Sequence, residues 1–295
     1  MRVWSVVRDQ TALAKNVYNV LLRLNYVFDS RRGCQAESER RLRSDSFFAF
    51  RQQDAEKFRL LAVFPKADKI SERTRDKMIF ENMDRIVFAG DSVTDMGSQC
   101  PVGEGLFDNL GHSYVRVIDN LLATAYPEIK IRVTNSGISG NTSRDLLERF
   151  GRDVVDLKPQ WVSICIGIND VWRQFDSPSL PDTQVQPEEY QNNLEKMILA
   201  VKNDVKGIFI LTPYYMEPNE QDAMRARMDE YVQICKLLAD KYQCRLVDFQ
   251  KMYAEYCRVR HSSFIAWDRI HPNQVGATLM AREFLRCCDF DFNRQ

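Results

Sequence analysis

The chain has 295 residues, of which 44% are hydrophobic and 28% are charged, enough apolar material for a sizeable core. Its 41 basic and 41 acidic residues cancel, so the whole chain lacks the basic excess that is typical of nucleic-acid-binding proteins. The sequence contains no apolar run of about 18 residues, so no membrane-spanning helix is predicted.

The first part of the chain differs in composition from the rest. Residues 1–80 contain 17 Lys and Arg residues against 10 Asp and Glu residues, and Gly33 is their only glycine. Residues 30–80 are dense in charge and show no strand pattern. We predict that residues 1–77 form a basic extension, helical or partly disordered, and that residues 78–295 form a separate domain. Such a charge can favour a nucleic-acid or membrane surface, but a solvated extension is the simpler interpretation.

From Arg85 onward, short apolar runs alternate with longer amphipathic stretches. Because the runs are apolar throughout, we expect strands that are buried on both faces. Alternation of strands and helices predicts an α/β fold with a parallel sheet between helices. The predicted strands are residues 85–89, 131–135, 161–167, 207–212 and 245–249, and the predicted helices are residues 111–126, 142–157, 187–205, 221–242 and 273–287.

Cysteine usage favours reduced thiols. The eight cysteines include no C-x-x-C pair, and with only three histidines in the chain no zinc-ligand spacing occurs. Free thiols are usual in the cytosol, and the first ten residues lack the pattern of a secretory signal. We therefore expect a cytoplasmic protein without a metal.

The first candidate for chemistry follows the first predicted strand. Residues 88–95 read FAGDSVTD, so the strand leads through Gly90 and Asp91 to Ser92 and the start of a helix. Open α/β sheets bind ligands at the carboxyl ends of their strands, and a helix N-terminus favours negative charge. Ser92 is therefore a candidate reactive residue, although such turns are also common helix caps.

A second motif, DRIHP, occupies residues 268–272. In a helical turn residues i and i+3 share a face, so the carboxylate of Asp268 can reach the imidazole of His271. Such a pair is the base and its orienting group in a Ser–His–Asp system. The other two histidines, His112 and His261, lie in contexts typical of surface or capping residues.

Two further motifs follow the second and third predicted strands. NSGISGNT (135–142) contains Gly140, whose backbone N–H can approach a ligand closely, and GIND (167–170) contains the side-chain amide of Asn169. Acyl transfer needs donors aimed at the oxygen that becomes negative. The N–H groups of Ser92 and Gly140 and the amide of Asn169 would supply three. Each such residue alone is a common turn residue, but all the motifs lie at strand ends of one chain.

Together these motifs resemble the four signature blocks of the SGNH, or GDSL-type, hydrolase family. The blocks are GDS with Ser92, the glycine block with Gly140, G-x-N-D with Asn169, and D-x-x-H with Asp268 and His271. The resemblance implies a flavodoxin-like three-layer α/β/α domain with a central parallel sheet of about five strands. It also implies a serine esterase without cofactor or metal, in which Ser92 is the nucleophile, His271 the base and Asp268 its orienting group. The oxyanion hole then comprises Ser92, Gly140 and Asn169.

Longer stretches are similar to the intracellular bacterial acetylxylan esterases of this superfamily. They include EGLFDNLGHSYV (104–115), SICIGINDVWRQFD (163–176) and AWDRIHP (266–272). Those enzymes remove acetyl groups from imported xylo-oligosaccharides and form homo-oligomers. The resemblance therefore implies a cytoplasmic homo-oligomer that acts on acetylated xylo-oligosaccharides, with no nucleic-acid or membrane partner. Since a member would begin near Met78, one hypothesis is that residues 1–77 lie upstream of the native start and add nothing to catalysis.

Four residues near the motifs are candidate substrate contacts: Asp91, Trp172, Tyr214 and Trp267. The two tryptophans can stack on a sugar ring, or they can be ordinary core or rim aromatics. Other substrates remain open, namely those of a lysophospholipase, a thioesterase or another sugar O-acetylesterase. A non-catalytic carbohydrate-binding or scaffold protein is a further alternative, although such a protein has no need of the Asp268–His271 pair.

Overall fold

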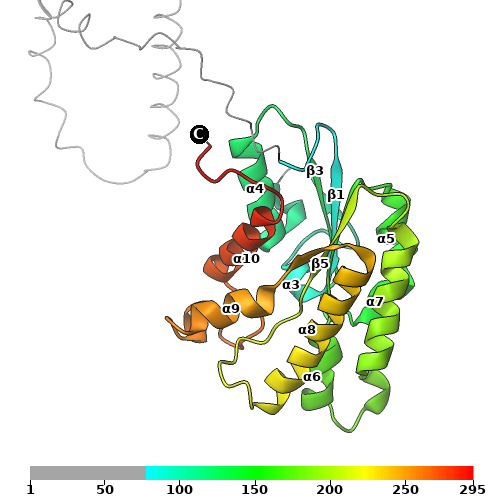
Figure 1. Ribbon diagram of the computed structural model, residues 1–295, viewed down its shortest axis with the longest axis vertical. Helices are drawn as coiled ribbons and strands as arrows, with labels where there is room; N and C mark the ends of the chain where they lie inside the picture. The colour runs from blue at the N-terminus through cyan, green and yellow to red at the C-terminus, as the bar shows by residue number, and fades with distance from the viewer. Residues whose placement is uncertain (1–77, 106, 295) are drawn as a thin grey trace, which may run out of the picture. The chain divides into compact units, whose positions relative to one another are not determined.

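The computed structural model describes residues 78–105 and 107–294. The predicted basic extension, residues 1–77, lies outside the described residues, so its predicted character stays a prediction. Within the described residues, no helix is both long enough and apolar enough to cross a membrane. Helices and strands are labelled as in Figure 1.

A six-stranded sheet forms the centre of the domain (Figure 1). Its strands are β1 (Arg85–Gly90), β2 (Gly103–Glu104), β3 (Arg132–Gly137), β4 (Trp161–Cys165), β5 (Gly207–Leu211) and β6 (Arg245–Val247). They are arranged in the order β2-β3-β1-β4-β5-β6, and every neighbouring pair except β2–β3 is parallel. The five parallel strands therefore have the flavodoxin-like order, in which the second strand lies outside the first. This confirms the predicted fold class.

The predicted count of about five strands misses β2. This strand has two residues and pairs antiparallel with the outer side of β3, where Gly103 lies opposite Asn135 and Glu104 opposite Thr134. A two-residue strand has no periodicity that a sequence pattern can reveal. The five predicted strands correspond to β1, β3, β4, β5 and β6, with bounds that differ by at most two residues.

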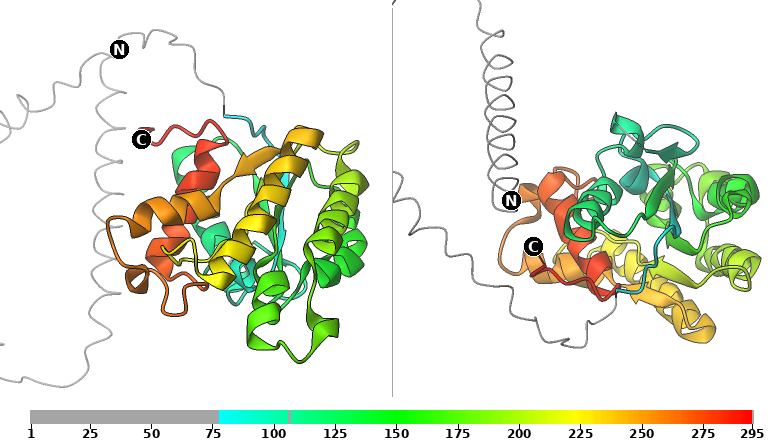
Figure 2. Two further views of the ribbon diagram at one scale, coloured as in Figure 1. Left: turned by 60° about the horizontal axis from the view of Figure 1, so that its bottom comes forward. Right: turned by 90° about the horizontal axis from the view of Figure 1, so that it is seen from above.

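Helices cover both faces of the sheet (Figures 1 and 2). They are α3 (Ser92–Asp95), α4 (Tyr114–Ala125), α5 (Ser143–Asp153), α6 (Ile168–Asp176), α7 (Pro187–Val201), α8 (Ala223–Tyr242), α9 (Phe249–Cys257) and α10 (Gln274–Arg286). On one face α10 contacts α4 and α9, and on the other α7 contacts α5 and α8. The five predicted helices correspond to α4, α5, α7, α8 and α10, and the helix start expected at Ser92 is α3, while α6 and α9 were not predicted.

Side-chain caps explain where several helices begin. Thr142 and Asp145 form a capping box at α5, in which each side chain bonds the other residue's backbone N–H. Asn273 caps α10 by accepting from the N–H of Val275 and of Gly276. Since both caps lie directly after motif loops, they fix where those loops must end.

The core is continuous across the sheet because the central strands are buried on both faces. Every residue of β4 is buried, as are the last five residues of β1. Phe284 of α10 packs against the sheet, with its ring centroid 5.1 Å from that of Phe88 and 4.6 Å from that of Phe209. Full burial of one such side chain contributes about 1.5–3 kcal/mol to stability. The two ends of the domain also meet, since the Ile79 N–H donates to the Cys288 carbonyl over 3.2 Å.

Candidate active site

Three of the motif loops meet at the carboxyl edge of the sheet because their strands are neighbours. Strand β1 pairs with β3 on one side and with β4 on the other. The residues that follow these strands include Ser92, Gly140 and Asn169, respectively. Gly90 lets α3 begin directly at this edge, since a Cβ there would lie 2.3 Å from Thr94 Oγ1 and 2.5 Å from a backbone carbonyl of β4. The topology therefore brings distant motifs to one place.

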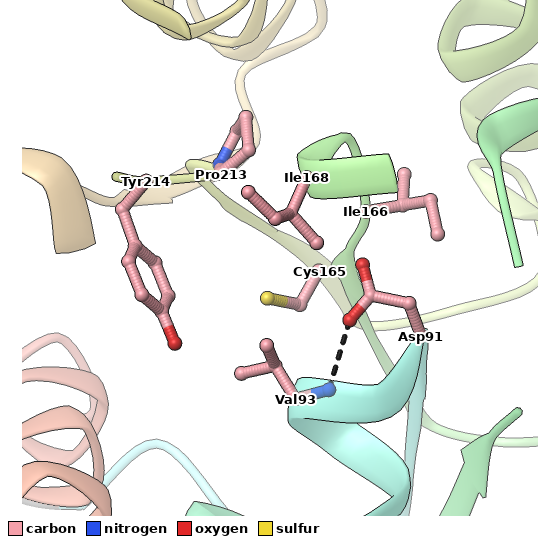
Figure 3. Close-up of a pocket in the computed structure, with 7 residues that line it drawn as sticks. All are labelled: Asp91, Val93, Cys165, Ile166, Ile168, Pro213 and Tyr214. Carbon is pink, nitrogen blue, oxygen red and sulfur yellow. Dashed lines mark hydrogen bonds between the residues drawn. The ribbon is translucent and has the colours of Figure 1, made fainter. Parts of the chain in front are cut away.

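Ser92 is the first residue of α3, and Asp91 caps this short helix. The Asp91 carboxylate accepts the N–H of Val93 over 3.0 Å, and Figure 3 shows it turned inward toward that N–H. The Asp91 side chain is buried, whereas Ser92 is half-buried and so retains access to solvent. The cap thus fixes the turn while the hydroxyl of the next residue stays available.

His271 links Ser92 to Asp268. Its Nε2 lies 2.8 Å from Ser92 Oγ, and its Nδ1 lies 2.5 Å from Asp268 Oδ2. Asp268 Oδ1 accepts two backbone N–H groups, from Ile270 at 2.9 Å and from His271 at 2.8 Å. The motif does not form the predicted helical turn: residues 267–271 form a bend, and Arg269 adopts a left-handed φ of 64°. The carboxylate reaches the ring because it caps this bend, not because of helical spacing.

The Asp268 carboxylate is held in its charged form. Burial raises its pKa, but the hydrogen bonds from the His271 ring and from two backbone N–H groups outweigh this and leave the pKa below its usual value. A charged oxygen beside Nδ1 keeps the ring proton there and leaves the Nε2 lone pair facing Ser92. This arrangement can take a proton from the serine hydroxyl and return it later.

The groups predicted as oxyanion donors each keep an N–H that is free to bind a ligand. Gly140 has a left-handed φ of 85°, and a Cβ there would meet nothing within 4 Å. Glycine is therefore favoured here by the backbone conformation and not by a lack of room for a side chain. The Asn169 amide is 2% exposed and donates one hydrogen to the Asn141 carbonyl over 2.9 Å, which leaves its second hydrogen. Within residues 78–105 and 107–294, the N–H groups of Ser92 and Gly140 donate to no other group.

The four candidate substrate contacts fall into two pairs. Trp172 is half-buried with its ring centroid 6.2 Å from that of His271, and Trp267 is 87% exposed. Asp91 and Tyr214 are only 1% and 3% exposed, so their burial does not fit the predicted direct contact with substrate. Both line the pocket shown in Figure 3, in which Val93 and Cys165 also take part.

Tyr214 has a supporting position instead. Its hydroxyl donates to the Ile270 carbonyl over 2.9 Å, one residue before His271. Tyr214 follows β5, which places it against the bend that carries Asp268. The hydroxyl of this buried tyrosine therefore holds the backbone of the bend next to His271.

Sequence reasoning missed two buried ionic groups behind the loops. Asp170 accepts the Ser143 N–H with both carboxylate oxygens at 3.0 Å and so joins the start of α6 to that of α5. Arg149, on α5, donates hydrogen bonds to the backbone carbonyls of Gly90 at the end of β1 and of Ser136 near the end of β3. These contacts join residues that lie 13 to 59 positions apart along the chain, so no local pattern predicts them.

Two buried carboxyl groups predict a dependence of stability on pH. Burial raises the pKa of Asp91 to about 7; the Val93 N–H opposes this shift, and the charge of Asp170 adds to it. Burial likewise raises the pKa of Asp170 to about 7, against the hydrogen bonds from Ser143. Because the folded state binds these protons more tightly than the unfolded chain, the two groups contribute most to the free energy of unfolding below about pH 4. Their contribution falls as pH rises to about 7.

The Asp91→Asn variant cannot titrate at this position but keeps an oxygen for the Val93 N–H. The free energies of unfolding of the variant and the wild type are measured with denaturant at pH 5, 6, 7 and 8. The value of the variant relative to that of the wild type should rise by at most about 1.4 kcal/mol per pH unit up to pH 7. Parallel stability curves for the two proteins would contradict the assignment.

Metal ligands and disulfides are not features of the described part of the chain. No group of three or more His, Cys, Asp or Glu side chains there is arranged to hold a metal ion. The seven cysteines within it are free thiols. The two remaining histidines match their predicted character: His112 is exposed, and His261 caps a 3-10 turn at Ser262–Phe264.

Comparison with known proteins gives consistent matches. Residues 88–279 match the GDSL-like lipase/acylhydrolase family. The chain is 46% identical over 211 residues to an acetylxylan esterase of Geobacillus stearothermophilus, which covers 72% of this chain and 96% of that protein.

Two solved structures are similarly close. A crystal structure of Axe2, an acetylxylan esterase from G. stearothermophilus, is 45% identical with a TM-score of 0.71, covering 73% of this chain and 98% of that one. LAE5, an α/β hydrolase from the metagenome of Lake Arreo, is 44% identical with a TM-score of 0.71, covering 73% of this chain and all of that one. The resemblance drawn from the motifs is therefore confirmed. The chain belongs to the GDSL-like lipase/acylhydrolase family of SGNH hydrolases and is a serine hydrolase of carboxylic esters.

Proposed function

We propose that the chain removes O-acetyl groups from xylo-oligosaccharides by Ser–His–Asp catalysis through an acetyl-enzyme. The hydrogen-bonded series from Ser92 through His271 to Asp268 is the observation that carries the chemistry. The acetylxylan esterase that shares 46% identity supports the choice of substrate.

In the first half of the reaction, Ser92 Oγ attacks the carbonyl carbon of the acetyl ester while His271 Nε2 accepts the hydroxyl proton. The carbonyl oxygen becomes negative and accepts hydrogen bonds from the N–H groups of Ser92 and Gly140 and from the Asn169 amide. His271 then donates its proton to the sugar oxygen, and the bond between that oxygen and the acetyl carbon breaks. The deacetylated sugar leaves.

In the second half, a water molecule attacks the acetyl-enzyme and His271 accepts its proton. Collapse of the second tetrahedral intermediate breaks the bond to Ser92 Oγ, which recovers the proton from His271, and acetate leaves. Asp268 keeps the ring proton on Nδ1 and stabilises the imidazolium in both halves. No metal or cofactor takes part in this scheme.

The leaving sugar would lie near two tryptophans. Trp172 contacts the His271 ring from one side, and Trp267 offers an 87% exposed indole directly before Asp268. Flat apolar faces of this kind stack on sugar rings, and we assign the two residues this role. Asp91 and Tyr214 take no part in substrate contact in this proposal, because both are buried.

Acetate release from acetylated xylo-oligosaccharides tests the substrate. We expect the full chain to release acetate and, in a parallel series of nitrophenyl esters, to prefer acetate over butanoate and octanoate. If the chain cleaves nitrophenyl acetate but releases nothing from the oligosaccharides, xylan is discarded and another sugar acetate becomes the substrate class. Preference for octanoate would instead indicate a lysophospholipase or thioesterase. Failure to cleave any ester would favour a binding or scaffold role.

Three further properties belong to the same proposal. We infer a cytoplasmic location, supported by the free thiols of the described residues, and assembly into a homo-oligomer. Residues 1–77 are proposed to add nothing to catalysis, which resides in residues 78–295. No nucleic acid or membrane is required as a partner.

A further inference from the structure

Arg149, on α5, is a buried charged residue with no part in the scheme above. Its side chain is 8% exposed. Nε donates to Asn141 Oδ1 at 2.7 Å; one terminal nitrogen donates to Ser136 Oγ at 3.1 Å and to Asp153 at 3.3 Å. The other donates to the carbonyls of Gly90 at 3.0 Å and of Ser136 at 2.9 Å. These five bonds use all five N–H donors that a guanidinium possesses.

The acceptors belong to the segments that carry the proposed oxyanion donors. The Gly90 carbonyl ends β1, two residues before Ser92. The side chain of Asn141 lies in the loop after β3, directly after Gly140. The backbone carbonyl of that same Asn141 accepts the Asn169 amide. The guanidinium of Arg149 is therefore bonded to the segments that hold Ser92 and Gly140, and through Asn141 it is linked to the amide of Asn169.

Only an arginine can make this set of contacts. A lysine ammonium has three donors around a single point, whereas the planar guanidinium reaches acceptors on three segments at once. Its charge is balanced by Asp153, which is 1% exposed and also bonded to Arg152. Since Arg152 is 71% exposed and bonds only Asp153, its replacement alters the surroundings of this aspartate but removes none of the links to the loops.

Oxyanion donors must be held within about 0.5 Å of their working positions to be effective, and a displacement of about 1 Å costs on the order of 10²-fold in rate. A loop built on glycines does not hold itself so closely. We propose that Arg149 is the positioning residue of the oxyanion hole, holding the turn of Ser92 and the loop of Gly140 and Asn141 in register. This inference rests on the proposed roles of Ser92, Gly140 and Asn169.

The test compares Arg149→Met, which keeps the length and helix propensity of the side chain, with two other variants. Asn169→Ala removes one oxyanion donor and should lower kcat by about 10²–10³. With nitrophenyl acetate, Arg149→Met should lower kcat by about 10², with KM changed less than about twofold, because the lost interaction acts in the transition state. The matched control Arg152→Ala, on the same helix and the same aspartate, should keep the wild-type kcat.

Combination of the substitutions separates positioning from general loosening of the fold. In the Asn169→Ala background, the factor by which Arg149→Met lowers kcat should be at least about threefold smaller than in the wild type. The reason is that one of the donors positioned by Arg149 is already absent. Full additivity, or a folded Arg149→Met variant with the wild-type kcat, would overturn the inference. If Arg149→Met does not fold, Asn141→Ala decides: it removes only the Nε link, and a wild-type kcat there overturns the inference as well.

The same set separates this inference from the proposed function. If Asn169→Ala leaves kcat unchanged, the oxyanion hole itself is misassigned. If Asn169→Ala has its expected effect and Arg149→Met has none, only the positioning role fails.

Discussion

Ser92→Ala should lower kcat for nitrophenyl acetate by about 10⁶, the loss typical of removing the nucleophile of such a triad. Alanine leaves His271 and the oxyanion donors in place but no oxygen to attack the ester. A residual rate of about 10³–10⁴ over water is expected from those remaining groups. Turnover of the purified variant, measured beside the wild type, gives the result.

A matched variant separates this loss from damage to the fold. Ser98→Ala removes a hydroxyl that bonds only Asp95 in the segment just after α3, and it should keep the wild-type kcat. A fluorophosphonate probe should label the wild type and Ser98→Ala but not Ser92→Ala. Substantial turnover by an unlabelled Ser92→Ala variant would remove Ser92 as the nucleophile.

Asp268→Asn should lower kcat by about 10⁴. Two backbone N–H groups, from Ile270 and His271, already bond Oδ1, so the new amide must place its oxygen there and its NH₂ opposite the His271 ring. Nδ1 then becomes an acceptor, the ring proton moves to Nε2, and no lone pair faces Ser92. The histidine is present but holds its proton on the wrong nitrogen.

Asp222→Asn is the control for this substitution. Asp222 also caps backbone, accepting the Arg225 N–H at the start of α8, and the same change there should leave kcat unaffected. Steady-state kinetics of both variants, together with their melting temperatures, check the prediction. A kcat for Asp268→Asn within tenfold of the wild type would mean that Asp268 does not set the proton position.

The strand pattern was predictable because central parallel strands are apolar on both faces. The five runs from RIVFA to RLVDF therefore stand out from the helices between them. The order of the strands is a different matter, since it depends on which loops cross the sheet. That order was implied only by the family resemblance, and the short antiparallel β2 had no signal at all.

The candidate site was predictable where a motif is local. Asp91-Ser92 and Asp268–His271 each lie within a few residues, so their relation could be inferred from spacing, although the bend at Arg269 could not. Burial and long-range contacts were not accessible. Tyr214 and Asp91 were predicted as substrate contacts, and only the packed structure shows that both side chains are almost fully buried. Arg149 has no motif because the contacts that link it to β1 and β3 join segments that are distant in the sequence.

The hydrogen bond from Ile79 to Cys288 has a practical consequence for engineering. It joins the first and last described segments near the start of β1, one strand length, or about 20 Å, from the carboxyl edge that carries Ser92. Nearby termini away from a functional site favour circular permutation. A short linker could close the domain there, and new ends could be opened at the exposed residues Asn203 and Asp204, between α7 and β5. The domain is therefore suited to insertion into a host protein with its substrate entrance left free.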